Sequence, residues 1–182
     1  MEERQFRAPV ARRWKPADAF GHQGNVRAAM ISHFQFVPEA VGFADAATKS
    51  AAIDAMATLF SRVYGIDLAL LAERMNEREA MGSTGFGRGV AIPHARVPGL
   101  KRPVAGFLKL AQPIDFAAVD GAPVNMVFGL ISPEQSGVAH LHALAAISRL
   151  MRDESVQASL IAAKREDELF GLLSNVIDRN AA

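Results

Sequence analysis

The sequence of 182 residues is half hydrophobic and carries a formal net charge of +1. This composition predicts one folded domain with a substantial core and excludes a disordered chain. The small net charge gives no indication of nucleic-acid binding, and the absence of cysteine excludes disulfides, thiolate nucleophiles and cysteine-based zinc sites.

The first predicted segment in chain order is a basic, loosely ordered extension over residues 1–32. Its first 29 residues hold six Arg or Lys against three Asp or Glu and show no helical apolar stripe. They also lack the apolar core of a secretory signal, and no run in the chain approaches the roughly 20 apolar residues of a membrane helix. We therefore expect a cytoplasmic protein without membrane insertion.

Two helices and three strands are predicted next. Apolar residues three or four apart predict a helix over 48–65, which ends at Gly65, and Asp67 stands at the N-cap position of a second helix over 68–79. The last strand-like segment is so apolar that it predicts a central strand buried on both faces. The three strand-like segments are 89–97, 104–111 and 124–132.

The helical period returns after these strands. It runs over residues 138–153, 155–164 and 166–177. Helices, then strands, then helices predict an α/β sandwich built as a single domain.

A glycine-rich stretch, "GSTGFGRG" at 82–89, comes directly before "VAIPHAR". A Walker phosphate loop needs Gly-Lys-Ser/Thr where this chain has Gly-Val-Ala, and a Rossmann loop needs a strand before the glycines and a helix after them. Neither requirement is met. Pro93 favours extended backbone at the end of the strand, so His94 is predicted to be held rigidly at the rim of the sheet.

The segment "HLH" brings two further histidines, His140 and His142. On a helix, residues two apart point about 200° apart. His140 shares the apolar stripe and is predicted to face inward or toward a cleft, whereas His142 is predicted to face water. A zinc site formed by His94 and both of these histidines is disfavoured, since a helix separates the pair. We expect no metal.

A third chemistry uses His94 as a nucleophile that carries a phosphoryl group. It requires a neutral, approachable imidazole with nearby hydrogen-bond donors for the phosphoryl oxygens. No acidic pair for Mg²⁺ is evident, which favours transfer between protein histidines over ATP chemistry, without a cofactor. The candidate donors are Arg78, Ser83, Thr84 and the backbone amides of the glycine-rich loop, Gly85 among them.

Two segments, "REAMGSTGFGRGVAIPHAR" and "HLHALAAISRLMRD", closely resemble the IIA domain of the bacterial phosphoenolpyruvate phosphotransferase system, of the fructose/mannitol type. The resemblance covers about residues 33–178. It implies a mixed β-sheet flanked by α-helices, with His94 as the phosphorylated residue, His140 beside it and Arg78 as the active-site arginine. Ser83 and Thr84 match the polar loop positions of the family.

The resemblance also implies partners. Family members take phosphate from a histidine phosphocarrier, HPr or its nitrogen-branch equivalent, and pass it to a IIB domain or bind target proteins. The loop is most like the nitrogen-regulatory form, and no fused IIB or IIC domain is evident, so a regulator is expected. A sugar-transport IIA that serves a separate IIB, and a binding module without phosphotransfer, stay open, as does the oligomeric state, a homodimer included.

Two departures from the family pattern concern partner choice. Arg88 replaces the usual small polar residue and Ala95 replaces the common glycine after the histidine. Arg88 is either a second cation for the phosphate or a solvated loop residue. Phe86, Val97 and Leu100 are either a contact patch for a protein donor or part of the core.

Overall fold

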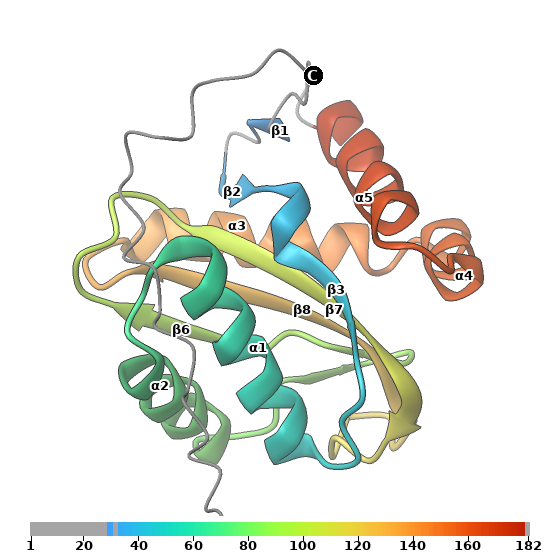
Figure 1. The fold of residues 1–182 in the computed structure, drawn as a ribbon, viewed down its shortest axis with the longest axis horizontal. Helices are drawn as coiled ribbons and strands as arrows, with labels where there is room; N and C mark the ends of the chain where they lie inside the picture. The colour runs from blue at the N-terminus through green and yellow to red at the C-terminus, as the bar shows by residue number, and fades with distance from the viewer. Residues whose placement is uncertain (1–28, 31–32, 181–182) are drawn as a thin grey trace, which may run out of the picture.

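The computed structural model describes residues 29–30 and 33–180. Five helices and a short 3₁₀ turn, η2 (Pro38–Ala40), surround one β-sheet in the described part of the chain (Figure 1). The strands are β1 (Ala29–Met30), β2 (Gln35–Phe36), β3 (Val41–Ala44), β4 (Gly85–Gly87), β5 (Val90–Ala91), β6 (His94–Val97), β7 (Val104–Ile114) and β8 (Val124–Pro133). The helices are α1 (Lys49–Tyr64), α2 (Leu68–Ala80), α3 (Gly137–Leu150), α4 (Glu154–Ala162) and α5 (Glu166–Asn180).

The sheet is mixed and is built around an antiparallel pair, β7 and β8. The outer edge of β7 pairs in parallel with β2 and then β3. The outer edge of β8 pairs in parallel with β5 and then β6. The apolar segment 124–132 is therefore a central strand with neighbours on both sides, as its composition predicts.

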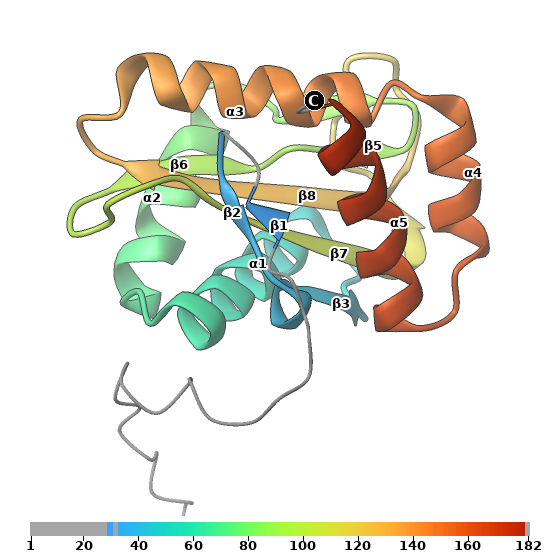
Figure 2. The same ribbon diagram turned by 90° about the horizontal axis from the view of Figure 1, so that it is seen from above.

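Helices cover both faces of the sheet. Figure 2 shows α3 on one side of the strands and α1 with α2 on the other. Two buried apolar clusters fill the two interfaces: one joins the sheet to α3, α4 and α5, and the other joins it to α1 and α2. The prediction of a single-domain α/β sandwich with a mixed sheet is confirmed. None of the described helices is long and apolar enough to cross a membrane.

The helix boundaries follow the predicted caps. The Thr48 hydroxyl accepts a hydrogen bond from the Ala51 amide at the start of α1, and Gly65 ends it in the left-handed conformation with φ 68°. Asp67 caps α2 through the Leu70 amide. The prediction that one helix runs through 153 is wrong, because Asp153 instead caps α4.

The strand predicted over 89–97 is in fact two strands. Pairing stops after Ala91 and resumes at His94, since Pro93 has no N–H to donate to the ladder. The short strands β1 to β4 were not predicted. They have two to four residues each, too short for a clear alternating pattern.

Helix α1 lies close to the sheet because of two glycines. Gly106 and Gly129 are paired neighbours on β7 and β8. A Cβ atom added at Gly129 would lie 2.6 Å from both Met56 Sδ and Phe60 Cε2. The absent side chains thus leave the space that the buried face of α1 fills.

The predicted extension over 1–32 lies largely outside the described residues. Its described part, β1, pairs antiparallel with β2, with Ala29 opposite Phe36. Within the described residues, sheet pairing thus includes Ala29 and Met30, which precede residue 33.

Candidate functional site

His94 is the first residue of β6, directly after the break at Pro93. Its Nδ1 atom lies 2.8 Å from the carbonyl oxygen of Ile92. A carbonyl oxygen can only accept a hydrogen bond, so Nδ1 carries the proton and Nε2 holds a lone pair. The bend at Pro93 therefore fixes both the orientation of the ring and its tautomer.

Arg78, in the last turn of α2, meets this lone pair. Its Nε–H donates to His94 Nε2 at 3.0 Å, and its Nη1–H donates to the Gly82 carbonyl oxygen at 2.9 Å. The second contact holds the guanidinium at the entrance of the glycine-rich loop. The Arg78 guanidinium is thus next to the position that a negatively charged group bound to His94 Nε2 would occupy.

His140, in the first turns of α3, reaches the site from the other face of the sheet. Its ring centroid lies 5.4 Å from that of His94, and the two planes are inclined by 52°. Its Nδ1 lies 2.8 Å from Ser132 Oγ, on β8. His140 is 4% exposed and His142 is exposed, so the helical-stripe prediction for this pair is confirmed.

Both site histidines are held in the neutral form. Burial lowers the pKa of His94, and the positive charge of Arg78 lowers it further, against the opposing effect of the Ile92 carbonyl. Burial also lowers the pKa of His140 to about 4, helped by His94, Arg96 and Arg78. At neutral pH the lone pair on His94 Nε2 is therefore available for reaction.

The glycine-rich loop is held by hydrogen bonds to its own neighbours. The carboxylate of Glu79 accepts from the Thr84 amide at 3.1 Å and from the Thr84 hydroxyl at 2.5 Å, and it pairs with Lys49 at 2.5 Å. Burial alone would raise the pKa of Glu79, but the hydrogen bonds from Lys49 and Thr84 outweigh it and hold the pKa below its usual value. Glu79 thus ties α1 and α2 to the loop.

The other two predicted phosphate-binding residues are engaged in the same way. Ser83 Oγ donates to the Phe116 carbonyl oxygen at 2.8 Å and accepts from the Gly85 amide at 3.1 Å. A Cβ atom at Gly85 would lie 2.6 Å from the Ala118 backbone, so no side chain fits there. The structure brings His94, Arg78 and His140 together, while the donors of Ser83, Thr84 and Gly85 hold the loop.

Arg96 is a cation of the site that the sequence interpretation missed. It lies two residues after His94 on β6, so both side chains are on the same face of the strand. Arg96 is exposed, and its charge lowers the pKa of both site histidines. The spacing His-x-Arg in a predicted strand is the signal that identifies it.

Arg88, by contrast, is turned toward α4. Its Nη1 lies 3.3 Å from the Arg152 carbonyl oxygen and 3.5 Å from Glu154 Oε1. Its backbone has φ 55° at the turn between β4 and β5, a conformation that is uncommon outside glycine. Both contacts lie at the start of α4, so its guanidinium is engaged away from the site.

The proposed contact patch is mostly core. Of the two alternatives, the core holds for Val97, which is fully buried, and Phe86 and Leu100 are half-buried against the two apolar clusters. The side chain of Val97 points inward because it alternates with that of Arg96.

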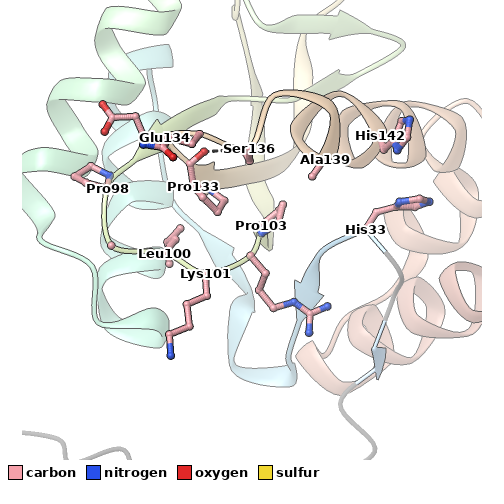
Figure 3. A pocket seen from close by; sticks show the side chains of 13 residues that line it. His33, Pro98, Leu100, Lys101, Pro103, Pro133, Glu134, Ser136, Ala139 and His142 are labelled. Atoms are coloured by element: carbon pink, nitrogen blue, oxygen red, sulfur yellow. Dashed lines mark hydrogen bonds between the residues drawn. The ribbon is translucent and has the colours of Figure 1, made fainter.

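A pocket of about 830 Å³ lies beyond the carboxyl end of β6 (Figure 3). The loop 98–103, the segment 133–136 and two residues of α3 line it, and His33 faces His142 across one end at 5.7 Å between ring centroids. None of His94, Arg78 and His140 contributes to it. Among the residues that the structure describes, no group of three or more His, Asp or Glu could hold a metal ion.

Residues 36–176 match the family described as phosphoenolpyruvate-dependent sugar phosphotransferase system, EIIA 2. A nitrogen regulatory protein of Bradyrhizobium diazoefficiens is 37% identical over 127 residues, which cover 70% of this chain and 83% of that protein. A fructose-specific EIIA component of Haloferax volcanii is 34% identical over 135 residues, which cover 72% and 86%. The crystal structure of nitrogen regulatory protein IIA-Ntr from Neisseria meningitidis matches with a TM-score of 0.71 and 29% identity, over 76% of this chain and 95% of that one.

Proposed function

The chain belongs to the EIIA 2 family of the phosphoenolpyruvate-dependent sugar phosphotransferase system, and from that premise we propose that it carries a phosphoryl group on Nε2 of His94. The family relays phosphoryl groups between protein partners. The observation that carries the proposal for this chain is the hydrogen bond from His94 Nδ1 to the Ile92 carbonyl oxygen, because it leaves Nε2 with a lone pair.

The reaction is an in-line transfer between two histidines. The lone pair of His94 Nε2 attacks the phosphorus of a phosphohistidine on a carrier protein. A new N–P bond forms, the N–P bond on the carrier breaks, and its electron pair returns to the carrier's nitrogen. The His94 ring gains positive charge, and the Ile92 carbonyl oxygen stabilises that charge through the proton on Nδ1.

Arg78 has to change partner during this reaction. Its Nε–H covers His94 Nε2 at 3.0 Å, so it must leave the lone pair before the phosphorus can approach. The phosphoryl oxygens that arrive at the same place are better acceptors, because they are charged. Arg78 is therefore the residue that balances the charge of the transferred group, and Ser83, Thr84 and Gly85 support it by holding the loop.

We assign the donor to the class of small histidine phosphocarriers, HPr or its nitrogen-branch equivalent, in the cytoplasm. Arg96 is suited to meet such a partner, since it is exposed beside His94 and forms no ion pair with the described residues. It presents a positive charge to the phosphoryl group or to acidic residues around it.

The similarity to nitrogen regulatory proteins favours a regulatory role, in which phosphorylation of His94 changes binding to target proteins. A second candidate is a sugar-transport component that passes the phosphate to a separate IIB protein. It is supported by the 34% identity to a fructose-specific EIIA component.

The test is incubation of the full chain with a phosphorylated HPr-type carrier, followed by intact-mass measurement. We expect one acid-labile phosphate on the wild type and on His142→Ala, and none on His94→Ala. Acceptance of phosphate by His94→Ala would refute the assignment of His94, and absence of phosphate from the wild type would leave a binding module without phosphotransfer. Addition of purified IIB proteins then separates the two roles, since a regulator retains its phosphate and a transport component loses it.

A further inference from the structure

Ser132 is a buried hydroxyl whose hydrogen-bond partner is a histidine of the site. It lies on β8 with no exposed surface, and its Oγ is 2.8 Å from His140 Nδ1. Within the described residues this is the one hydrogen bond of the hydroxyl. The direction of that bond therefore decides whether the proton of Ser132 has an acceptor.

A hydroxyl has one proton to donate and two lone pairs to accept with. If His140 Nδ1–H donated to Ser132, the proton of the buried hydroxyl would have no acceptor, which costs free energy. If Ser132 donates to Nδ1, that proton is satisfied and only lone pairs are left. The second direction is therefore favoured, and it puts the proton of the neutral His140 ring on Nε2.

The Nε2 atom of His140 reaches the surface of the protein. No buried side-chain nitrogen or oxygen among the described residues lacks a hydrogen-bond partner, and Nε2 of His140 has no partner there. This nitrogen must therefore reach the surface, although the residue as a whole is 4% exposed. Its ring centroid lies 5.4 Å from that of His94, so this surface-accessible nitrogen belongs to a ring that packs beside the reacting histidine.

We propose that Ser132 is a positioning residue that fixes His140 as the Nε2–H tautomer, so that His140 donates a hydrogen bond to the phosphoryl group on His94. The opposite tautomer would present a lone pair to the phosphoryl oxygens and repel them. The two histidines thus have complementary roles: His94 Nε2 attacks, and His140 Nε2–H stabilises the oxygens that arrive. The purpose assigned to Ser132 rests on the proposed function, whereas the tautomer does not.

The tautomer is tested by ¹⁵N NMR of the imidazole rings in the full-length, unphosphorylated protein at pH 7.5. Two-bond ¹H–¹⁵N correlations distinguish Nε2–H from Nδ1–H. We expect His140 to be Nε2–H in the wild type, to show a mixture of tautomers in Ser132→Ala, and to return to Nε2–H in Ser132→Thr. The matched control is Ser136→Ala, which removes a nearby hydroxyl that donates to the Pro133 carbonyl oxygen instead.

The wild-type spectrum alone decides the tautomer, even where a variant folds poorly. An Nδ1–H signal for His140 in the wild type, or a pure Nε2–H form in a folded Ser132→Ala, would overturn the inference. The second readout is the rate of phosphate acceptance from the carrier. It should fall about 10-fold in Ser132→Ala, as expected for a lost hydrogen bond to a charged group, and recover in Ser132→Thr.

An unchanged rate of phosphate acceptance in Ser132→Ala would refute the proposed role of Ser132 in phosphate transfer. A wild type that takes no phosphate refutes the proposed function instead, and the NMR result then still decides whether Ser132 sets the tautomer.

Discussion

The burial of His140 predicts a loss of stability in mild acid. The pKa of His140 is lowered from 6.5 to about 4 in the folded protein, mainly by burial. The unfolded chain therefore takes up this proton first as the pH falls. This titration leaves the unfolding free energy unchanged well above pH 6.5 and lowers it progressively as the pH falls toward 4.

The magnitude follows from the two pKa values. Between pH 8 and pH 5 the linkage relation gives a loss of about 2 kcal/mol from His140 alone. We take this as an upper value and expect about 1 to 2 kcal/mol, because Nε2 reaches solvent and the charged form is partly hydrated. His94 adds a loss of the same sign, since its pKa is also lowered.

Urea denaturation at several pH values between 8 and 5 measures this loss. The variant His140→Gln has no ring to protonate, so its unfolding free energy should fall by about 1 to 2 kcal/mol less than that of the wild type over this range. His142→Gln, an exposed position on the same helix, should keep the wild-type pH dependence. An unchanged pH dependence in His140→Gln would refute the argument that His140 is held neutral by burial.

Three further changes test separate parts of the structure. Glu79→Gln weakens the contacts that hold the loop and should lower the unfolding free energy by about 1–3 kcal/mol in urea; an unaffected variant would show that this buried carboxylate does not hold the loop. Gly129→Ala should cost about 1–3 kcal/mol because α1 must move, whereas Gly137→Ala, with open space around the added carbon, should cost much less; equal costs would contradict the close packing. Arg96→Gln should weaken binding of a phosphorylated carrier about 5-fold at low salt and less at high salt. The control Arg88→Gln should leave binding unchanged, because the guanidinium of Arg88 pairs with α4. A larger effect in Arg88→Gln than in Arg96→Gln would contradict the assignment of Arg96.

The sequence predicts those parts of the site that depend on one element. The inward position of His140 follows from its place on the apolar stripe of a single helix, and the rigid position of His94 follows from the proline before it. Both need only the local period and the backbone limits of proline. The fold class follows in the same way, from the order of long periodic segments.

The remaining contacts depend on how separate elements meet. Ser132 touches His140 because the end of β8 lies under α3, and no local pattern gives that register. The sequence predicts that Ser83 and Thr84 bind phosphate because their hydroxyls belong to the glycine-rich loop that precedes His94. The acceptor of each hydroxyl depends on how the elements pack. It is the Phe116 carbonyl oxygen for Ser83 and the Glu79 carboxylate at the end of α2 for Thr84. Arg96 could have been predicted as a site residue, because residues two apart on a strand share a face and His94 is on β6.

The position of the phosphoryl group on the His94 ring tests the central claim most directly. The protein, labelled with ¹⁵N at its histidines, is phosphorylated by an HPr-type carrier, and ¹H–¹⁵N correlations then identify the nitrogen bound to phosphorus. Since Nδ1 donates to Ile92 and Nε2 holds the lone pair, the phosphoryl group is expected on Nε2 of His94. A phosphoryl group on Nδ1, or on any other residue, would contradict the account.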